Sequence, residues 1–250
     1  MSEYLSGNYC CLTDKGRVRD TNEDSARAAT NAYGNVFLIV ADGMGGHQKG
    51  EYASQELVNH LAKSFLDLEE EFKSIKVAKK WLNKVVCEAN LKIYKKAQSA
   101  EEYKGMGTTL SACLIIKDTL ITAQVGDSRI YRLNDKELEQ ITIDQTYVNY
   151  LINTKKLSAE EANAHPDRHK LTNAVGTKEN LNVDIHVYQY NKEKLLLCSD
   201  GLYNNVPVKD LHSILKGNDS LDKKCLQLIA FGNANGGTDN MAVIIWEANK

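Results

Sequence analysis

The chain has 250 residues, of which 42% are hydrophobic and 26% charged, enough for one domain with a sizeable core. Its 31 basic and 33 acidic side chains give a formal net charge of −2, with no long basic run, which argues against nucleic acid or an anionic membrane as a partner. The longest apolar runs have about six residues, too few to span a membrane.

The N-terminal stretch MSEYLSGNYCC and the cysteines indicate the compartment. The stretch has neither a basic start nor an apolar core, so we expect no signal peptide. None of the six cysteines forms a C-x-x-C pair. We expect reduced, mostly buried thiols in a cytoplasmic protein rather than zinc ligands or disulfides.

Eight strand-like runs follow one another along the chain, near residues 8–14, 35–41, 108–117, 119–125, 128–134, 183–190, 194–199 and 240–246. The three middle runs are joined by very short links at Lys117-Asp118 and Gly126-Asp127. Links this short permit only antiparallel neighbours, because a parallel return needs a long crossover. The sheet is therefore expected to be at least partly antiparallel.

Two long amphipathic helices are expected between the second and third strands, from about Gly50 to Leu68 and from about Val77 to Ala97. Each should cover a sheet, because each has a single apolar stripe. The stripes consist of Ala53, Leu57, Leu61 and Phe65 in the first helix and of Ala78, Trp81, Val85 and Ala89 in the second. Further helices fit residues 208–215 and 219–232.

Residues 144–180 are polar and interrupted, unlike the rest of the chain. Ser158 followed by Glu161 has the form of a capping box, which predicts the start of a short helix. We interpret the segment as a lid or substrate-binding flap on a single domain that comprises residues 1–250.

The stretch ADGMGGHQKG, residues 41–50, directly follows the apolar run NVFLIV. It fails the dinucleotide-binding pattern because Gln48 replaces the third glycine, and it fails the P-loop pattern because Glu51-Tyr52 replaces Lys-Ser/Thr. Asp42-Gly43 could instead form a hairpin turn. A helical pattern rather than a strand follows, which disfavours that alternative.

The same arrangement, an aspartate next to the end of a strand, recurs at Asp127, Asp200 and Asp239. Any one of these aspartates could be a simple turn residue, but together they can gather several carboxylates at one end of the sheets. Such carboxylates raise one another's pKa unless a cation is present. An all-oxygen ligand set suits Mg²⁺, Mn²⁺ or Ca²⁺, and a pair of such ions suits hydrolysis of a phosphate ester.

With these pieces assembled, the sequence resembles the PPM family of metal-dependent protein serine/threonine phosphatases, the type 2C enzymes, in its short bacterial form. The matching motifs span nearly the whole chain in family order. They are Arg19-x-x-Asn22-Glu23-Asp24, Asp42-Gly43-Met44-Gly45-Gly46-His47, Gly107-Thr108-Thr109, Val125-Gly126-Asp127-Ser128-Arg129, Ser199-Asp200-Gly201 and Gly237-Thr238-Asp239-Asn240.

The resemblance implies an α+β fold, a four-layer αββα sandwich of two antiparallel sheets flanked by helices. It also implies two to three Mn²⁺ or Mg²⁺ ions that activate a water, with Arg19 binding the substrate phosphate. The implied metal residues are Asp42 as the bridge, Asp200 and Asp239 at the first ion, the Gly43 carbonyl at the second, and Asp127 at a third, weaker position. Asp24, with Glu23 as a further candidate, would bind the second ion directly or through water. A side chain at residue 43 would block such a carbonyl contact, which would explain the glycine.

Three features depart from the family pattern or leave a choice open. Met44 stands where many eukaryotic relatives have a histidine proposed as general acid, so His47 could protonate the leaving oxygen, or could merely pack at the helix start. The flap has Gln145 and Asn173 where bacterial relatives often have histidine and arginine, which bears on substrate affinity. The stretch His165–His169 is interpreted as flap rather than as a metal site, because Pro166 interrupts it.

The resemblance implies a phosphatase that acts on phosphoserine and phosphothreonine in proteins and opposes a bacterial serine/threonine kinase. Near-neutral charge and the absence of a tail favour a soluble monomer, which we expect in the cytoplasm. Two alternatives stay open at this stage. One is a catalytically silent scaffold or sensor of the same fold, and the other is an enzyme for small phosphate esters.

Overall fold

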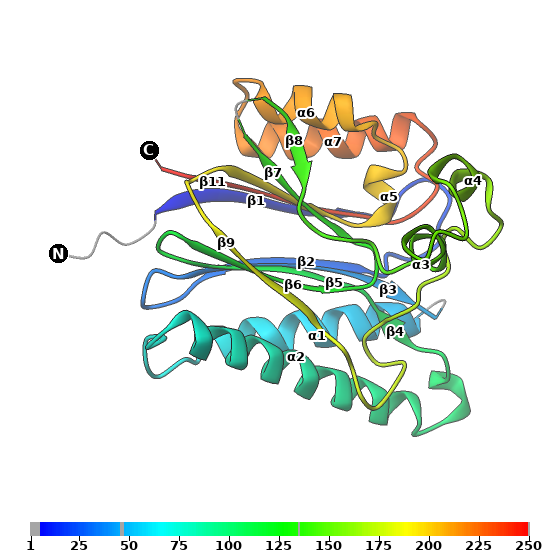
Figure 1. The fold of residues 1–250 in the computed structure, drawn as a ribbon, viewed down its shortest axis with the longest axis horizontal. Coiled ribbons are helices and arrows are strands. Elements are labelled where there is room, and N and C mark those ends of the chain that lie inside the picture. Colours follow the sequence, from blue (N-terminus) through cyan, green and yellow to red (C-terminus); the bar gives the residue numbers. More distant parts are fainter. Residues whose placement is uncertain (1–5, 46–47, 135, 250) are drawn as a thin grey trace.

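Two antiparallel β-sheets pack face to face in the computed structural model, which describes residues 6–45, 48–134 and 136–249 (Figure 1). The first sheet consists, in spatial order, of β1 (Gly7–Asp14), β11 (Met241–Ala248), β10 (Lys194–Cys198), β7 (Arg129–Leu133) and β8 (Leu138–Gln140). The second consists of β2 (Asp24–Thr30), β3 (Val36–Met44), β5 (Leu110–Ile116), β6 (Thr119–Val125) and β9 (Asp184–Gln189), with β4 (Gly107–Thr108) paired to β3.

Helices cover the outer face of each sheet, which confirms the αββα sandwich (Figure 1). The second sheet carries α1 (Gln48–Leu66) and α2 (Ile75–Ala97), followed by the 3-10 turn η1 (Glu101–Tyr103). The first sheet carries α5 (Asp200–Tyr203), α6 (Val208–Lys216) and α7 (Leu221–Ala234). Helices α3 (Tyr147–Asn153) and α4 (Ala159–Ala164) lie apart from both layers, at one end of the sandwich.

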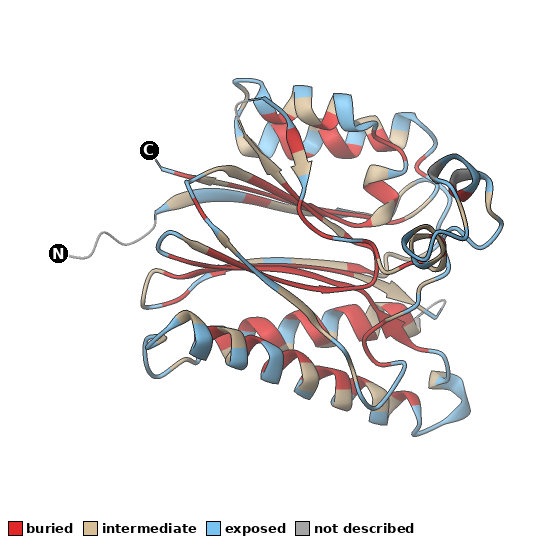
Figure 2. Cartoon of the chain, in the orientation of Figure 1, coloured by how far each residue is buried: buried red, intermediate tan, exposed pale blue. Residues whose placement is uncertain are grey.

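Strand β3 is buried on both faces, which accounts for its unbroken apolar sequence (Figure 2). Successive side chains of a strand point to opposite faces. Val36, Leu38 and Val40 therefore pack against the other sheet, whereas Phe37 and Ile39 pack under α1 and α2, and all of them are fully buried. This strand carries Asp42 at its end, so a rigid element holds that carboxylate.

The predicted helix stripes are confirmed. Ala53, Leu57, Leu61 and Phe65 of α1 are fully buried, Ala78, Val85 and Ala89 of α2 are buried, and Trp81 is partly buried against the same core. The predicted capping box is confirmed as well, because the Ser158 hydroxyl and the Glu161 carboxylate each accept a hydrogen bond from the other residue's backbone N–H. All six cysteines are free thiols, as expected. The structure adds β2, β4, β8, α3 and α5, which the sequence analysis did not predict.

Strand β2 is the most important of these additions, because it begins at Asp24. Its sequence, DSARAAT, contains alanines in place of large apolar residues, so it lacks the usual composition of a strand. Its extended state depends on pairing with β3 along its whole length.

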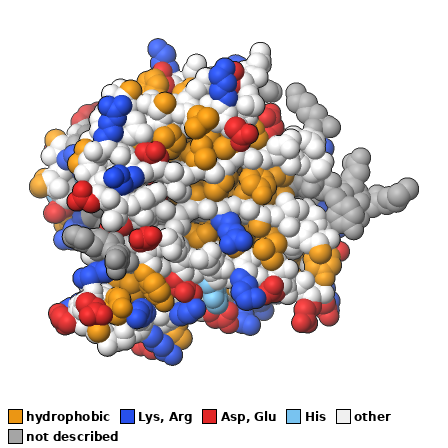
Figure 3. All heavy atoms as spheres, turned by 180° about the vertical axis from the view of Figure 1, so that it is seen from behind, with side chains coloured by type: hydrophobic (Ala, Val, Ile, Leu, Met, Phe, Trp, Pro, Cys, Tyr) orange, Lys and Arg blue, Asp and Glu red, His pale blue; other side chains and the backbone are white. Residues whose placement is uncertain are grey.

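The edge strands β1 and β2 lie together on the back of the molecule, where hydrophobic side chains reach the surface (Figure 3). Cys11, Ala26 and Ala28 are partly buried there against the layer between the sheets, and Tyr9 is exposed. Within the described ranges, no helix combines the length and the apolar character that crossing a membrane requires.

Candidate metal centre and active site

The pairing of β2 with β3 brings two carboxylates together. Asp24 lies directly opposite Asp42 in the strand register, within hydrogen-bonding reach of it. Asp24 is only 7% exposed, and its Oδ2 accepts a 2.6 Å hydrogen bond from the Ser199 hydroxyl of the other sheet. Like charges directly opposite in a sheet destabilise it, so this pair requires a proton or a cation.

The predicted aspartates of the other strands reach the same place. Asp127 lies in the turn between β6 and β7, Asp200 begins α5 two residues after the end of β10, and Asp239 precedes β11. Because β10 and β11 are antiparallel, the end of one lies beside the start of the other. Together with Asp42, these residues line a pocket of about 560 Å³. Asp24 does not line this pocket, although it lies opposite Asp42 in the strand register.

Burial and mutual repulsion raise the pKa of these carboxyl groups. Burial is the largest cause at Asp24 and Asp127, and the charge of Asp200 adds to it, so that the pKa of each group rises to about 8. The pKa of Asp42 rises well above its ordinary value, first through burial and then through the charge of Asp24. Burial and Asp239 raise the pKa of Asp200 as well.

The donor chemistry fits a hard divalent cation, since the pocket concentrates carboxylate oxygens without cysteine. In the part of the chain that the structure describes, no three His, Cys, Asp or Glu side chains form a ready-made metal-binding group. Asp42 lies instead within hydrogen-bonding reach of both Asp24 and Asp200. The fit to cations therefore rests on the buried charge that they would neutralise, and the side chains would have to turn to enclose an ion.

Arg19 provides the cationic side chain that the sequence analysis placed at this site. It lines the pocket, and its Nη2 lies 2.7 Å from Oδ2 of Asp239. Burial alone would lower the pKa of Arg19, but the contact with Asp239 outweighs burial and raises it. The Arg19 side chain is 55% exposed, so part of the guanidinium faces open solvent.

Backbone contacts fix Asp42 from both sides. Its N–H donates to the Thr109 hydroxyl, and its carbonyl accepts from the Thr109 N–H and the Thr108 hydroxyl, each at 2.9 Å. The motif Gly107-Thr108-Thr109 thus acts as a clamp on Asp42, a role that the sequence alone did not reveal.

Gly43 is required by close backbone packing. A Cβ at residue 43 would lie 2.2 Å from the carbonyl oxygen of Gly50 and 2.5 Å from that of Glu23. This packing is a reason for the glycine in addition to the carbonyl–metal contact that the family resemblance implies, which stays a prediction. Gly201 has a similar role, because a Cβ there would lie 1.9 Å from the carbonyl oxygen of Asn240.

The flap contributes two pocket residues that the sequence analysis had not assigned to the site. His169 and Leu171 line the pocket opposite the strand ends, although the stretch around His169 was interpreted only as flap. The two flap residues that depart from the bacterial pattern bind each other, since Asn173 Nδ2 donates to Gln145 Oε1 at 2.9 Å. His47, the predicted general acid, lies outside the described residues.

Comparisons with known proteins agree with this geometry. A family model described as protein phosphatase 2C matches residues 15–228. The chain is 39% identical over 241 residues to the serine/threonine phosphatase stp of Listeria welshimeri, covering 95% of this chain and 94% of that protein. It is 35% identical over 240 residues to the protein phosphatase PhpP of Streptococcus pneumoniae, covering 96% of each.

Solved structures extend the likeness to the whole fold. The S. agalactiae serine/threonine phosphatase superposes with a TM-score of 0.92 at 34% identity, covering 98% of this chain and 100% of that one. The catalytic domain of the serine threonine protein phosphatase PstP, in complex with 2 manganese ions, gives a TM-score of 0.84 at 32% identity, with the same coverage. These findings confirm the resemblance drawn from the motifs, and the chain belongs to the protein phosphatase 2C family.

Proposed function

We propose that the protein is a metal-dependent phosphatase that hydrolyses phosphoserine and phosphothreonine in proteins. The observation that carries the proposal is the pocket that Asp42, Asp127, Asp200 and Asp239 share with Arg19, in a chain of the protein phosphatase 2C family. Relatives at 35–39% identity are named serine/threonine or protein phosphatases, which supports this substrate class.

The carboxylates would hold two to three Mn²⁺ or Mg²⁺ ions, as the manganese complex of PstP supports. In this proposal Asp42 would help to hold two ions, with Asp200 and Asp239 at the first. The Gly43 carbonyl would contribute to the second, and so would Asp24, directly or through a water. Asp127 would contribute to a third. Bound ions would neutralise the carboxylates and supply an activated water for attack on phosphorus.

The chain's own residues would bind and orient the phosphoryl group. Arg19 would hold two of its oxygens, because a guanidinium matches a phosphate by paired hydrogen bonds. The contact with Asp239 keeps Arg19 at the pocket, so little reorientation is needed when substrate arrives. His47 would donate the proton to the leaving serine or threonine oxygen.

The natural partners in this proposal are phosphorylated proteins and a cognate serine/threonine kinase whose action the enzyme reverses. We propose that it acts as a soluble monomer in the cytoplasm. We propose a single domain, residues 1–250, on which residues 144–180 form the flap over the pocket.

The first test is metal-dependent turnover of a phosphothreonine peptide. We expect activity with Mn²⁺ and none with a chelator. Asp42→Asn removes a carboxylate charge from the metal centre and should lower kcat/KM about 10³-fold, which corresponds to about 4 kcal/mol of transition-state stabilisation. Asp118→Asn, in the exposed turn between β5 and β6, is the matched control and should keep full activity. Wild-type protein without Mn²⁺-dependent turnover would contradict the proposal and favour a silent scaffold.

Stability should depend on pH and Mn²⁺ together. The folded-state pKa of Asp24 and Asp127 is about 8, whereas an unfolded aspartate has a pKa of about 4. Between these values the folded state binds more protons, so these groups lower the free energy of unfolding of the metal-free protein as pH rises. Each unit of pKa difference corresponds to about 1.4 kcal/mol.

Urea denaturation at pH 5.5 and pH 8, with chelator and with Mn²⁺, measures this effect. Metal-free Asp127→Asn should gain stability over wild type at pH 8 relative to pH 5.5, and Mn²⁺ should stabilise wild type more at pH 8. A wild-type-to-variant difference that is the same at both pH values would show that Asp127 does not titrate in this window.

Arg19 should act on substrate more than on metal. We expect Arg19→Lys to lower kcat/KM for the phosphopeptide about tenfold, because a lysine keeps the charge but loses the paired contact. Arg17→Lys, two residues earlier and exposed outside the pocket, is the control. Unchanged kcat/KM in Arg19→Lys would remove the phosphate-binding role.

His47 is tested by the leaving group. If it protonates the departing oxygen, His47→Ala should lower kcat more for a phosphothreonine peptide than for an aryl phosphate, whose leaving group needs less protonation. Equal losses on both substrates would refute the role of general acid.

A further inference from the structure

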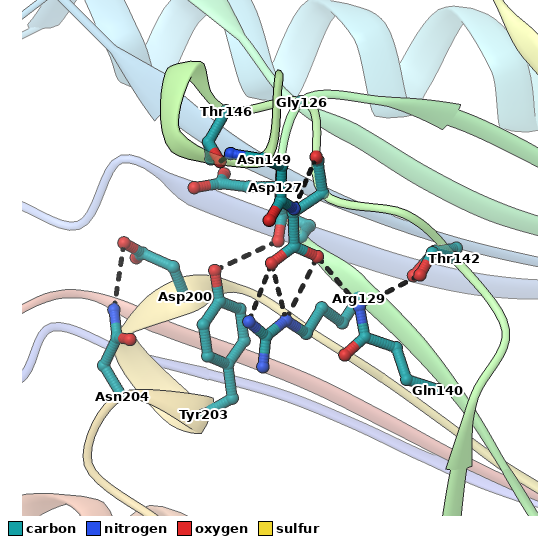
Figure 4. Close-up of polar contacts among 12 residues, drawn as sticks. Gly126, Asp127, Arg129, Gln140, Thr142, Thr146, Asn149, Asp200, Tyr203 and Asn204 are labelled. Carbon is teal, nitrogen blue, oxygen red and sulfur yellow. Dashed lines mark hydrogen bonds and ion pairs between the residues drawn. The ribbon is translucent and has the colours of Figure 1, made fainter. Parts of the chain in front are cut away.

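Arg129 connects three segments that surround Asp127 (Figure 4). It begins β7, two residues after Asp127. Its Nε and Nη2 donate to Oδ2 of Asp144 at 3.0 and 2.7 Å, and its guanidinium lies 3.6 Å from the ring centroid of Tyr203. Asp144 begins the flap and Tyr203 ends α5, so one side chain contacts the first sheet, the flap and the helix that starts at Asp200.

Tyr203 contacts both Arg129 and Asp127, and so links Arg129 to the candidate metal site. Its hydroxyl donates to the backbone carbonyl of Asp127 at 3.1 Å, while its ring stacks on Arg129. Figure 4 shows the ring standing between Arg129 and Asp200, with the hydroxyl directed at Asp127. The position of the Asp127 backbone therefore depends on Tyr203, and that of Tyr203 depends on Arg129.

The flap is bonded to the same turn by a second route. The Gln145 N–H donates to the Gly126 carbonyl at 2.9 Å, and Gln145 Oε1 accepts from the Gly126 N–H at 3.0 Å. Asp144 is itself held in place, because Gln140 Nε2 donates to its Oδ1 and Asn149 Nδ2 to its carbonyl, both at 2.9 Å. The Asp127 turn and the base of the flap thus form one hydrogen-bonded unit.

Burial makes these contacts stronger than an ordinary surface ion pair. The side chains of Arg129 and Asp144 are only 23% and 10% exposed. A charge-assisted, two-pronged contact in such surroundings is geometrically specific. Groups that orient a metal ligand from outside the ligand set commonly change metal affinity 10- to 100-fold when they are altered.

We propose that Arg129 and Tyr203 are positioning residues that hold the Asp127 turn against the base of the flap and thereby set the affinity of the Asp127 position for a divalent ion. The inference rests on the proposed function, because it takes Asp127 to be a metal residue. It adds a link between the flap, which lines the pocket through His169 and Leu171, and the weakest metal position.

Two substitutions test this link while preserving the net charge. Tyr203→Phe removes the hydrogen bond to Asp127 and keeps the aromatic ring over Arg129. Arg129→Lys keeps the positive charge and loses the two-pronged contact with Asp144.

The chain offers a matched control for each substitution, Arg132 on β7 and Tyr188 on β9. Arg132 of β7 makes a similar contact with Glu139, and the Tyr188 hydroxyl donates to the Ile141 carbonyl at 3.0 Å. Neither the two test residues, Arg129 and Tyr203, nor the two control residues line the pocket. Arg132→Lys and Tyr188→Phe therefore make the same chemical changes away from Asp127.

Mn²⁺ binding to the purified, folded proteins is followed by calorimetry and by the paramagnetic resonance signal of free Mn²⁺, with the unfolding midpoint of the metal-free protein recorded in parallel. The ion whose binding is weakened or lost in Asp127→Asn is assigned to the Asp127 position. We expect Tyr203→Phe and Arg129→Lys to weaken that ion about tenfold and to leave the tighter ions unchanged. In the Asp127→Asn background, Tyr203→Phe should have no further effect on Mn²⁺ binding.

If Tyr203→Phe and Arg129→Lys bind Mn²⁺ with the same affinities as wild type, the inference is overturned, whatever the unfolding midpoints of the two variants. These residues would then have a purely structural role. Equal weakening in the two control variants would overturn it too. Either result leaves the proposed function intact, provided that wild type binds Mn²⁺ and hydrolyses the phosphopeptide with it. A wild type that does neither contradicts the proposed function and this inference together.

Discussion

Repulsion between carboxylates at adjacent strand ends is the constraint on which the rest of the structure depends. The register of β2 and β3 places Asp24 opposite Asp42, and Asp200 and Asp127 add their charge at close range. Local contacts relieve only part of this cost. Ser199 donates to Asp24 and Arg19 donates to Asp239, whereas Asp42 has a strongly raised pKa. A site that is this unfavourable without cations is well suited to bind them.

The site exists only when both sheets are packed. Asp24 and Asp42 come from the second sheet, and Asp200 and Asp239 flank strands of the first. The hydrogen bond from Ser199 to Asp24 crosses between the sheets directly below the pocket, and Asn240 Oδ1 accepts from the Glu23 N–H. Loss of packing between the sheets would therefore separate the carboxylates, so the fold and the metal centre depend on the same contacts.

Most of the individual strands and helices were predicted because their signals are local, whereas the four-layer arrangement was implied by the family resemblance. The unbroken apolar run of β3, the stripes of α1 and α2 and the short link at Lys117 each reflect a single element. Strand β2 escaped prediction because its alanines become a strand only through pairing with β3. Helix α5 was not predicted, because its four residues are too few to show a helical repeat of apolar residues.

The candidate site divides in the same way. Asp42, Asp127, Asp200 and Asp239 were found because each directly adjoins a recognisable strand. The clamp of Thr108 and Thr109 on Asp42 and the place of His169 in the pocket were not found, because they depend on contacts between segments distant in sequence. The structure adds a reason for Gly43 that the sequence did not show, because a Cβ at residue 43 would collide with neighbouring backbone.

The path of the chain explains how the flap can influence the metal centre. The chain leaves the first sheet after β8, forms the flap, and enters the second sheet at β9. On the way it is bonded twice beside the carboxylates, through Gln145 to Gly126 next to Asp127, and through Val175 to Thr108 next to the Asp42 clamp. A displacement of the flap therefore strains the supports of both aspartates, and Arg129 with Tyr203 resists that displacement on the Asp127 side.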